Sequence, residues 1–292
     1  MNKNVLEKKS FGSKAVFTVT FVIFSLYALT IIYTLFWLFT NSLKTIDEWD
    51  NSKFTLPIAF LKDGLFFQNY VSAWVELNYD GVGVPGMLFN SVWYSVGGAF
   101  VAVWFCCLTA YVISKYSFVG RNLIFTVAIV QMILPIVGNL PATYKMYNDL
   151  QITNSPLLLI SNAGGLGGNF MILFATFQGV SNSYMEAAKI DGAGHYSIFF
   201  KIMLPQAMPT MFAIFLLGFI GSWNDYMGPL LYLTEYPTLA TGLMLFEKDM
   251  VYNINMPVFY AGTVILVLPM IVLFVIFSDK MMTSVSMGGL KG

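Results

Sequence analysis

The sequence predicts an all-α integral membrane protein with six transmembrane helices, and two observations carry this prediction. The chain is 57% hydrophobic and 10% charged, with a mean hydropathy of +0.70, whereas a typical soluble domain has roughly 45 to 50% apolar and about 25% charged residues. The charged residues also cluster, and long stretches between the clusters contain no Lys, Arg, Asp or Glu. Each stretch exceeds the about 20 residues needed to cross a bilayer core, so a soluble fold is strongly disfavoured.

The predicted spans occupy the centres of these stretches: 15–39, 87–114, 123–140, 157–180, 207–227 and 258–277. The first span follows a basic flank that ends at Lys14, as a signal peptide would. It is longer than a signal-peptide core, however, and lacks a small-residue cleavage site. We therefore expect it to be retained as an anchor.

The distribution of basic residues predicts the orientation. Segments 1–14, 114–122, 181–206 and 279–292 hold ten of the fifteen Lys and Arg residues. Basic residues are enriched on the cytoplasmic side of membranes. We therefore expect a cytoplasmic N-terminus (1–14), a six-helix transmembrane domain (15–280) with an external loop (40–86) and a cytoplasmic loop (181–206), and a cytoplasmic C-terminal tail (281–292).

The cytoplasmic loop 181–206 carries the most distinctive pattern, SNSYMEAAKIDGAGHYSIFFKIMLP over 181–205. Ser181 or Ser183 can cap a short helix, and Gly192 can take the left-handed conformation that ends it. A second helix is predicted from about Gly194, and Pro205 marks the point where it enters the membrane. The residues alone therefore predict a short helix, a glycine turn and a second helix between two spans.

In this loop Glu186-Ala187-Ala188 is followed after three residues by Gly192, and after nine more by Ile202-x-Leu204-Pro205. This spacing resembles the EAA loop of the permease subunits of ABC importers. The resemblance implies the type I permease fold and a coupling helix that docks on a cytoplasmic ATPase subunit. The matching candidate residues are Glu186, Ala187, Ala188, Asp191, Gly192, Leu204 and Pro205. Ser181 stands where the family usually has proline, which leaves the start of the helix open.

Further motifs resemble the sugar-importing branch of that family, which is similar to the maltose-system permeases. They are Asn69-Tyr70 with Trp74, Asn90-Ser91, Ala110-Tyr111, Phe118-x-Gly120-Arg121 and Trp223-Asn224-Asp225-Tyr226 with Pro229-Leu230. The C-terminal residues 288–292, with Gly289 and Lys291, resemble a tail that reaches between the two ATPase subunits.

The resemblance implies a set of partners in a bacterial cell membrane. They are a second permease subunit forming a heterodimer, two ATPase subunits that bind ATP and magnesium, a solute-binding protein outside the membrane, and a carbohydrate. The chain itself has no Walker-type phosphate loop, so we expect it to be no enzyme and to bind no cofactor. Its fifteen basic and fifteen acidic residues balance, which suggests no nucleic-acid partner. Import of a non-sugar solute (an amino acid, a polyamine or phosphate) and secondary transport remain alternatives.

A few polar and aromatic residues in or near the spans are candidates for the translocation path: Asn90, Gln131, Trp223, Asn224 and Asp225. Carboxamides can bind sugar hydroxyls, but such residues more often join neighbouring helices. Asp225 either faces a wet cavity or lies at the outer membrane interface.

Other residues have simpler interpretations. The glycines 164, 165, 167 and 168 allow close helix packing or break the fourth span, and close packing is favoured. Cys106 and Cys107 are interpreted as packing residues. His195 is interpreted as a solvated or docking residue, and no metal site is expected, because it is the only histidine.

Overall fold

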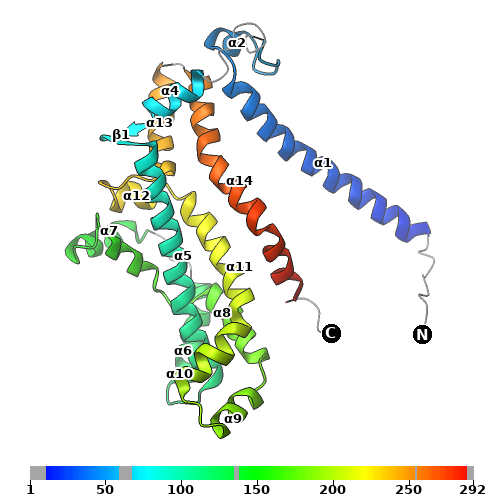
Figure 1. Ribbon diagram of the computed structural model, residues 1–292, viewed down its shortest axis with the longest axis vertical. Helices are drawn as coiled ribbons and strands as arrows, with labels where there is room; N and C mark the ends of the chain where they lie inside the picture. The colour runs from blue at the N-terminus through cyan, green and yellow to red at the C-terminus, as the bar shows by residue number, and fades with distance from the viewer. Residues whose placement is uncertain (1–10, 59–67, 135–137, 254, 288–292) are drawn as a thin grey trace. The chain divides into compact units, whose positions relative to one another are not determined.

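The computed structural model describes residues 11–58, 68–134, 138–253 and 255–287. This part of the chain is helical except for one short hairpin and the connecting loops (Figure 1). The chain divides into two compact units, one formed by Met1–Trp74 with Asp249–Ile265 and the other by Val75–Lys248 with Leu266–Gly292.

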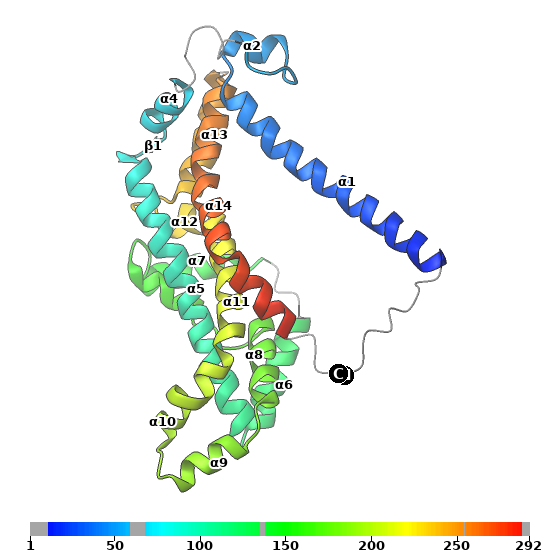
Figure 2. The same cartoon turned by 45° about the vertical axis from the view of Figure 1, so that its right-hand side comes forward.

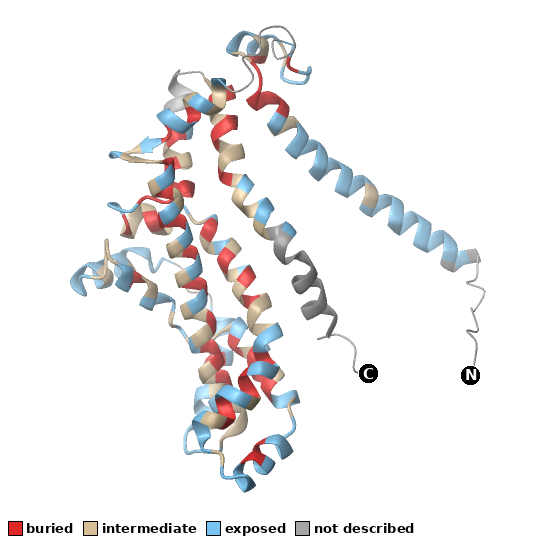
Figure 3. Cartoon of the chain, viewed as in Figure 1, coloured by how far each residue is buried: buried red, intermediate tan, exposed pale blue. Residues whose placement is uncertain are grey.

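Helix α1 (Phe11–Ser42) contains the first predicted span. Its apolar side chains are exposed along nearly the whole helix, which Figure 3 shows in pale blue. A helix that is apolar on all sides is stable only in lipid or against other apolar helices. The window 14–42 is long and apolar enough to cross a bilayer, in agreement with the first predicted span, and its retention as an anchor stays a prediction.

The segment after α1 folds around buried polar groups. Lys44 is 1% exposed, and its Nζ donates a hydrogen bond to the Ser52 carbonyl oxygen at 2.9 Å. Burial lowers the pKa of Lys44, and the nearby Glu48 carboxylate opposes that shift. Thr45 and Glu48 form a capping box at the start of α2 (Ile46–Asn51). The predicted external loop therefore begins with a compact, hydrogen-bonded segment.

A tight hairpin precedes the second span. The strands β1 (Asn78–Tyr79) and β2 (Val82–Gly83) pair antiparallel after α4 (Gln68–Glu76). Asp80 and Gly81 form the turn with φ of 49° and 84°, and positive φ at both positions is typical of the type I′ turns that join two-residue hairpins. Helix α5 (Val84–Lys115) begins directly after the hairpin.

The core of the second unit lies where α5 packs against α8 (Gly168–Gly179) and α11 (Leu204–Trp223). Cys106 and Cys107 are 4% and 0% exposed within this core, as expected of packing residues. A Cβ added at Gly218 on α11 would lie 3.5 Å from the Cβ of Ala99 on α5. Small residues thus allow these two helices to approach closely.

The third predicted span is not a single helix. Helix α6 (Arg121–Ile133) ends before Leu134, and α7 (Leu140–Asp149) begins after Gly138, which has φ 77°. Leu134 has an extended backbone, as expected of a residue that precedes a proline in the sequence. The prediction of a continuous helix over 123–140 is therefore wrong.

The fourth predicted span is also interrupted. The 3₁₀ helix η2 (Pro156–Asn162) and α8 are separated by residues 163–167, and Gly167 precedes α8 with φ 120°. A Cβ at Gly165 would collide with Thr109 Oγ1 and lie 3.3 Å from the carbonyl oxygen of Phe105 on α5. Close packing is thus correct for Gly165, but the glycines also break the span, so a continuous helix over 157–180 is wrong.

The last two predicted spans are long helices. Helix α11 ends at Trp223 rather than at residue 227, and α12 (Met227–Tyr232), α13 (Leu239–Asn253) and α14 (Met256–Met287) follow. Residues 281–287 of the predicted tail continue α14, and Gly289 and Lys291 lie outside the described residues. Within the described residues, four helices are long and apolar enough to span a bilayer: 14–42, Val84–Lys115, His195–Trp223 and Met256–Leu273. Six crossings remain a prediction.

Candidate functional site

The predicted coupling helix is α9 (Ser183–Ile190). Asn182 precedes it as the N-terminal cap, and its carbonyl oxygen accepts hydrogen bonds from the amides of Met185 at 2.9 Å and Glu186 at 3.0 Å. Asn182 occupies the N-cap position, and its side chain makes no bond to the first turn. Ser181 instead contributes from one position earlier, because its Oγ accepts a hydrogen bond from the Ser183 amide at 3.3 Å.

The predicted glycine turn follows α9. Gly192 has φ 81°, and its amide donates to the Lys189 carbonyl oxygen at 3.0 Å, while the Ala193 amide donates to the Ala188 carbonyl oxygen at 2.8 Å. Left-handed glycine with such reversed hydrogen bonds is a common helix ending. The next helix, α10 (His195–Ile198), starts after Gly194. Both sequence predictions for this turn are confirmed.

A π-helical segment joins α10 to α11. The amide of Leu204 donates to the carbonyl oxygen of Phe199 across η3 (Phe199–Met203). Pro205 follows this segment, and proline has no amide hydrogen and clashes with the carbonyl four residues before it. The wider π turn relieves that clash. Pro205 therefore marks a local irregularity in one continuous helix of 29 residues.

Burial separates the predicted loop residues into two groups. Ala188 and Leu204 are 7% and 8% exposed and belong to the core of the unit. Glu186, Ala187, Asp191, Gly192 and Pro205 are exposed. Ile190, at the end of α9, is 87% exposed. The outer face of α9 and the turn at Gly192 thus present charged and apolar groups together, whereas the second alanine of the EAA triplet points inward.

Figures 1 and 2 show α9 and α10 at the end of the second unit where α5 finishes. Two residues at this end of α5 contact the loop. Lys115 Nζ donates to the Val180 carbonyl oxygen at 2.6 Å and to Asn182 Oδ1 at 2.9 Å. The Tyr116 hydroxyl is hydrogen-bonded to His195 Nδ1 at 3.0 Å. Lys115 and Tyr116 lie between the motifs Ala110-Tyr111 and Phe118-x-Gly120-Arg121 but belong to neither, so the sequence patterns did not predict these contacts.

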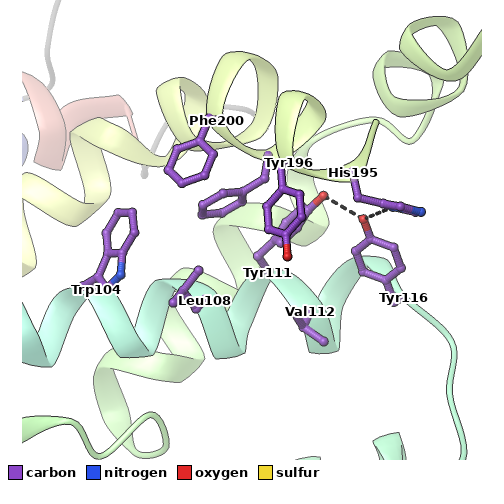
Figure 4. Close-up of a pocket in the computed structure, with 9 residues that line it drawn as sticks. Trp104, Leu108, Tyr111, Val112, Tyr116, His195, Tyr196 and Phe200 are labelled. Carbon is purple, nitrogen blue, oxygen red and sulfur yellow. Dashed lines mark hydrogen bonds between the residues drawn. The ribbon is translucent and has the colours of Figure 1, made fainter. Parts of the chain in front are cut away.

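Figure 4 shows that the hydrogen bond between Tyr116 and His195 borders an apolar cavity. The Tyr116 hydroxyl is also 3.1 Å from the Tyr111 hydroxyl, so Tyr111, Tyr116 and His195 form a short chain. His195 is exposed, as expected, but it is hydrogen-bonded as well as solvated. The cavity measures about 680 Å³ and is lined by Trp104, Leu108, Tyr111, Val112, Tyr116, His195, Tyr196, Phe199 and Phe200.

A second polar site surrounds Asp225, just beyond the end of α11. Asp225 Oδ1 accepts hydrogen bonds from the amides of Met227 and Gly228, both at 3.0 Å. Oδ2 accepts from the Tyr94 hydroxyl of α5 at 3.0 Å. The carboxylate therefore closes the first turn of α12 and joins it to α5. Gly228 is required there, because an added Cβ would collide with Asp225 and lie 2.9 Å from the Tyr94 hydroxyl.

Aromatic side chains gather near this carboxylate. The ring of Tyr232 lies 5.0 Å from that of Tyr147 and 6.2 Å from that of Tyr144. The pKa of Tyr232 is raised by burial first, and then by the neighbouring Tyr147 and Asp225. Together these groups offer hydroxyls, a carboxylate and ring faces, which is the chemistry that binds polyhydroxylated molecules.

The other candidate path residues differ in their surroundings. Asn90 is buried and links α5 to the loop before α13. Its Nδ2 donates to the Pro237 carbonyl oxygen at 3.0 Å, and its Oδ1 accepts from Trp93 Nε1 at 3.2 Å. Trp223 is 2% exposed, and its Nε1 has no hydrogen-bond partner among the described residues. Asn224 is exposed and donates to the Ile220 carbonyl oxygen at 2.8 Å. Gln131 is exposed on α6.

The family comparison covers both sites. Residues 96–279 match the model of the family described as binding-protein-dependent transport system inner membrane component. The chain belongs to this family. The matched region contains α9 and the Gly192 turn as well as Asp225, so the resemblance based on the EAA loop is confirmed and the chain is a membrane permease component.

Several permease proteins are similar to this chain over most of their length. The diacetylchitobiose uptake system permease protein NgcG of Streptomyces coelicolor is 29% identical over 90% of this chain and 85% of its own length. The arabinooligosaccharides transport system permease protein AraQ of Halalkalibacterium halodurans is 30% identical over 70% of this chain and 73% of its own. The maltodextrin transport system permease protein MalD of Streptococcus pneumoniae is 31% identical over 63% of this chain and 67% of its own.

A solved structure shares the fold. A chain from the crystal structure of a bacterial ABC transporter involved in the import of the acidic polysaccharide alginate superimposes with a TM-score of 0.71. The match covers 92% of this chain and 98% of that chain at 22% identity. The predicted fold class, an all-α permease of the ABC importer type, is therefore confirmed.

Proposed function

We propose that this permease component imports a sugar or an oligosaccharide by ATP-driven alternating access. The observation that carries the proposal is the family match over residues 96–279, which contains the folded EAA loop. The relatives named above transport diacetylchitobiose, arabinooligosaccharides and maltodextrin. Their shared substrate chemistry supports a carbohydrate over an amino acid, a polyamine or phosphate.

The chain performs no covalent chemistry in this proposal. It pairs with a second permease subunit, two ATPase subunits bind ATP and magnesium and hydrolyse the nucleotide, and a solute-binding protein outside the membrane delivers the sugar. Both termini and the loop 181–206 face the cytoplasm. ATP-driven closure of the ATPase pair moves the coupling loops and switches the translocation cavity between inward-facing and outward-facing states. Such a switch is a rigid-body transition between packed subunits.

The outer face of α9 docks on the ATPase subunit. Glu186, Ala187, Asp191 and Gly192 are exposed on this side of the loop, while Met185 and Ala188 pack into the core. Ile190 adds an exposed apolar group at the tip. A charged and apolar face anchored by a buried one is typical of a helix that enters a groove on a partner.

The group around Asp225 contributes to the sugar path. Its carboxylate and the hydroxyls of Tyr94 and Tyr232 are hydrogen-bonding groups for sugar hydroxyls. Asn90 serves this path by holding α5 in place rather than by contacting the sugar, because both ends of its carboxamide are already bonded.

Transport in vesicles tests the substrate class. The complete importer, reconstituted with ATP inside the vesicles and the binding protein outside, is offered radiolabelled maltotriose, arabinotriose and diacetylchitobiose, with glutamate, spermidine and phosphate as controls. We expect ATP-dependent accumulation of at least one sugar and of none of the controls. Accumulation of a control solute alone would reject the carbohydrate assignment.

A pair of variants tests the coupling role. Glu186→Lys reverses an exposed charge on α9, and we expect the protein to reach the membrane in normal amounts while sugar uptake is lost. Breaking one side of a buried interfacial charge pair costs about 2 to 5 kcal/mol. Lys248→Met, which removes an exposed charge from α13, should leave uptake unchanged. Normal uptake by Glu186→Lys would reject docking through this face.

A further inference from the structure

The last residue of α5 and the residue that follows it hold both ends of the coupling loop. Lys115 ends α5 and Tyr116 follows it. Lys115 contacts the residues where the loop begins, and Tyr116 contacts the residue where the second helix begins. We propose that Lys115 and Tyr116 act as a clamp that transmits displacement of the coupling loop to α5. This inference rests on the proposed coupling role of α9.

The lysine side of the clamp fixes the start of α9. Val180 is the capping residue directly after α8, and Asn182 is the capping residue directly before α9. The Lys115 ammonium donates to the carbonyl oxygen of the first and to the side-chain oxygen of the second. A cation at a helix C-terminus is favourable, and hydrogen bonds from a charged donor are stronger than neutral ones. One side chain thus sets the angle between α8 and α9.

The tyrosine side fixes the other end. His195 is the first residue of α10, and its Nδ1 bonds to the Tyr116 hydroxyl, which in turn bonds to the Tyr111 hydroxyl (Figure 4). A tyrosine hydroxyl can both donate and accept. The hydrogen bonds among Tyr111, Tyr116 and His195 therefore form whether His195 Nδ1 carries a proton or a lone pair. The link does not depend on the tautomer of His195.

Helix α5 then connects the clamp to the Asp225 site. The helix is unbroken from Val84 to Lys115. Tyr94 donates to Asp225, and Ser91 Oγ accepts from the Leu239 amide at 2.8 Å. Tyr94 and Lys115 lie 21 positions apart, which corresponds to about 30 Å along an α-helix. Movement of the loop is thereby carried along a single rigid element to the side chains proposed to line the sugar path.

The test separates transmission from assembly. The complete importer is reconstituted in vesicles with Lys115→Met, Tyr116→Phe, the double variant, and Lys248→Met as a lysine control. Three quantities are measured: the ATPase subunits retained, the rate of ATP hydrolysis, and the sugar transported per ATP hydrolysed. We expect both single variants and the double variant to retain the ATPase subunits and at least half of the hydrolysis rate. Sugar per ATP should fall about threefold in each single variant and at least tenfold in the double variant.

A conservative variant gives a second test of the clamp, measured as the sugar transported per ATP hydrolysed. The guanidinium of Lys115→Arg can donate to both loop oxygens, so we expect this variant to recover at least half of the sugar transported per ATP. If Glu186→Lys abolishes uptake but the double variant keeps the parental ratio, the clamp is rejected and the coupling role stands. Normal uptake by Glu186→Lys rejects the coupling role itself. If the double variant does not accumulate in the membrane, Tyr116→Phe provides the test, because it removes only a hydroxyl. A parental value of sugar transported per ATP in Tyr116→Phe then rejects the clamp.

Discussion

Gly192 and Gly194 lie two positions apart in the same turn but differ in what they require of the backbone. Gly192 has φ 81°, whereas Gly194 has φ −73°, and a Cβ added at either would have nothing within 4 Å. Space is therefore equal at the two positions and only conformation distinguishes them. A left-handed backbone costs an L-residue about 1 to 2 kcal/mol.

The two glycines provide a matched pair of variants. We expect Gly192→Ala to distort the turn after α9 and to reduce uptake several-fold at normal membrane abundance, while Gly194→Ala behaves as the parent. Gly192→Val should reduce uptake further because a β-branched side chain is more restricted. Uptake and membrane abundance are measured together. Equal uptake in Gly192→Ala and Gly194→Ala would show that the left-handed turn is unimportant for coupling.

Asp225 combines a structural and a functional role that two substitutions can separate. Asparagine keeps an oxygen for the amides of Met227 and Gly228 and places an amide group toward the Tyr94 hydroxyl, which can accept a hydrogen bond. Leucine removes every acceptor, and a buried donor left unpaired costs about 1 to 3 kcal/mol. We expect Asp225→Leu to lower the unfolding temperature and Asp225→Asn to preserve it, with reduced sugar uptake in both. Parental uptake in Asp225→Asn would limit Asp225 to its structural role.

Residue patterns predicted some of these features and missed others for identifiable reasons. The left-handed Gly192 followed from local backbone preferences, which a sequence displays directly. The inward position of Ala188 depends on its place in the core of the second unit, and the Lys115 and Tyr116 contacts join positions 65 or more apart in the sequence. Nothing in the loop sequence alone could reveal those contacts.

At the scale of elements, the charge-free stretches located the apolar segments but not their interruptions. Hydropathy counts apolar residues and does not register backbone angles. Gly138 and Gly167 have φ of 77° and 120°, and these conformations end or precede helices regardless of how apolar the flanking residues are. The second, fifth and sixth predicted spans, which lack such interruptions in their interiors, each correspond to a long helix.

Gly165 lies in one of these interruptions and gives a test of packing between elements. A Cβ there would collide with the hydroxyl of Thr109, which already donates a hydrogen bond to the Phe105 carbonyl oxygen at 2.8 Å. The hydroxyl can move away only by breaking this bond, and the carbonyl oxygen only by shifting α5. Overpacking of this kind costs about 1 to 3 kcal/mol. We expect Gly165→Ala to lower the thermal unfolding midpoint of the purified importer by several degrees.

The neighbouring glycine is the control for this substitution. A Cβ at Gly164 has nothing within 4 Å, so Gly164→Ala should leave the midpoint unchanged. A Gly165→Ala midpoint equal to that of Gly164→Ala would mean that the loop between η2 and α8 is not packed against α5 in the importer.

At the scale of the whole molecule, the distribution of charges predicts the orientation in the membrane. The segments predicted to be cytoplasmic hold ten of the fifteen basic residues, and they include both the loop with α9 and the Lys115–Arg121 connection that follows α5. Basic residues resist translocation. The clamp, the coupling helix and the cavity beside them are therefore all expected on the cytoplasmic side, and residues 40–86 on the opposite side.

Cysteine labelling tests this orientation without relying on transport. The native Cys106 and Cys107 are buried, so the parent protein should react little with a membrane-impermeant maleimide. Glu76 on α4 and Gly194 before α10 are both exposed, and each can be replaced by cysteine in turn. Glu76→Cys should be labelled on intact cells, whereas Gly194→Cys should be labelled only after the membrane is permeabilised. The reverse pattern would place the α9 loop outside the cell, where no ATPase subunit could reach it, and would overturn the proposed coupling together with the orientation.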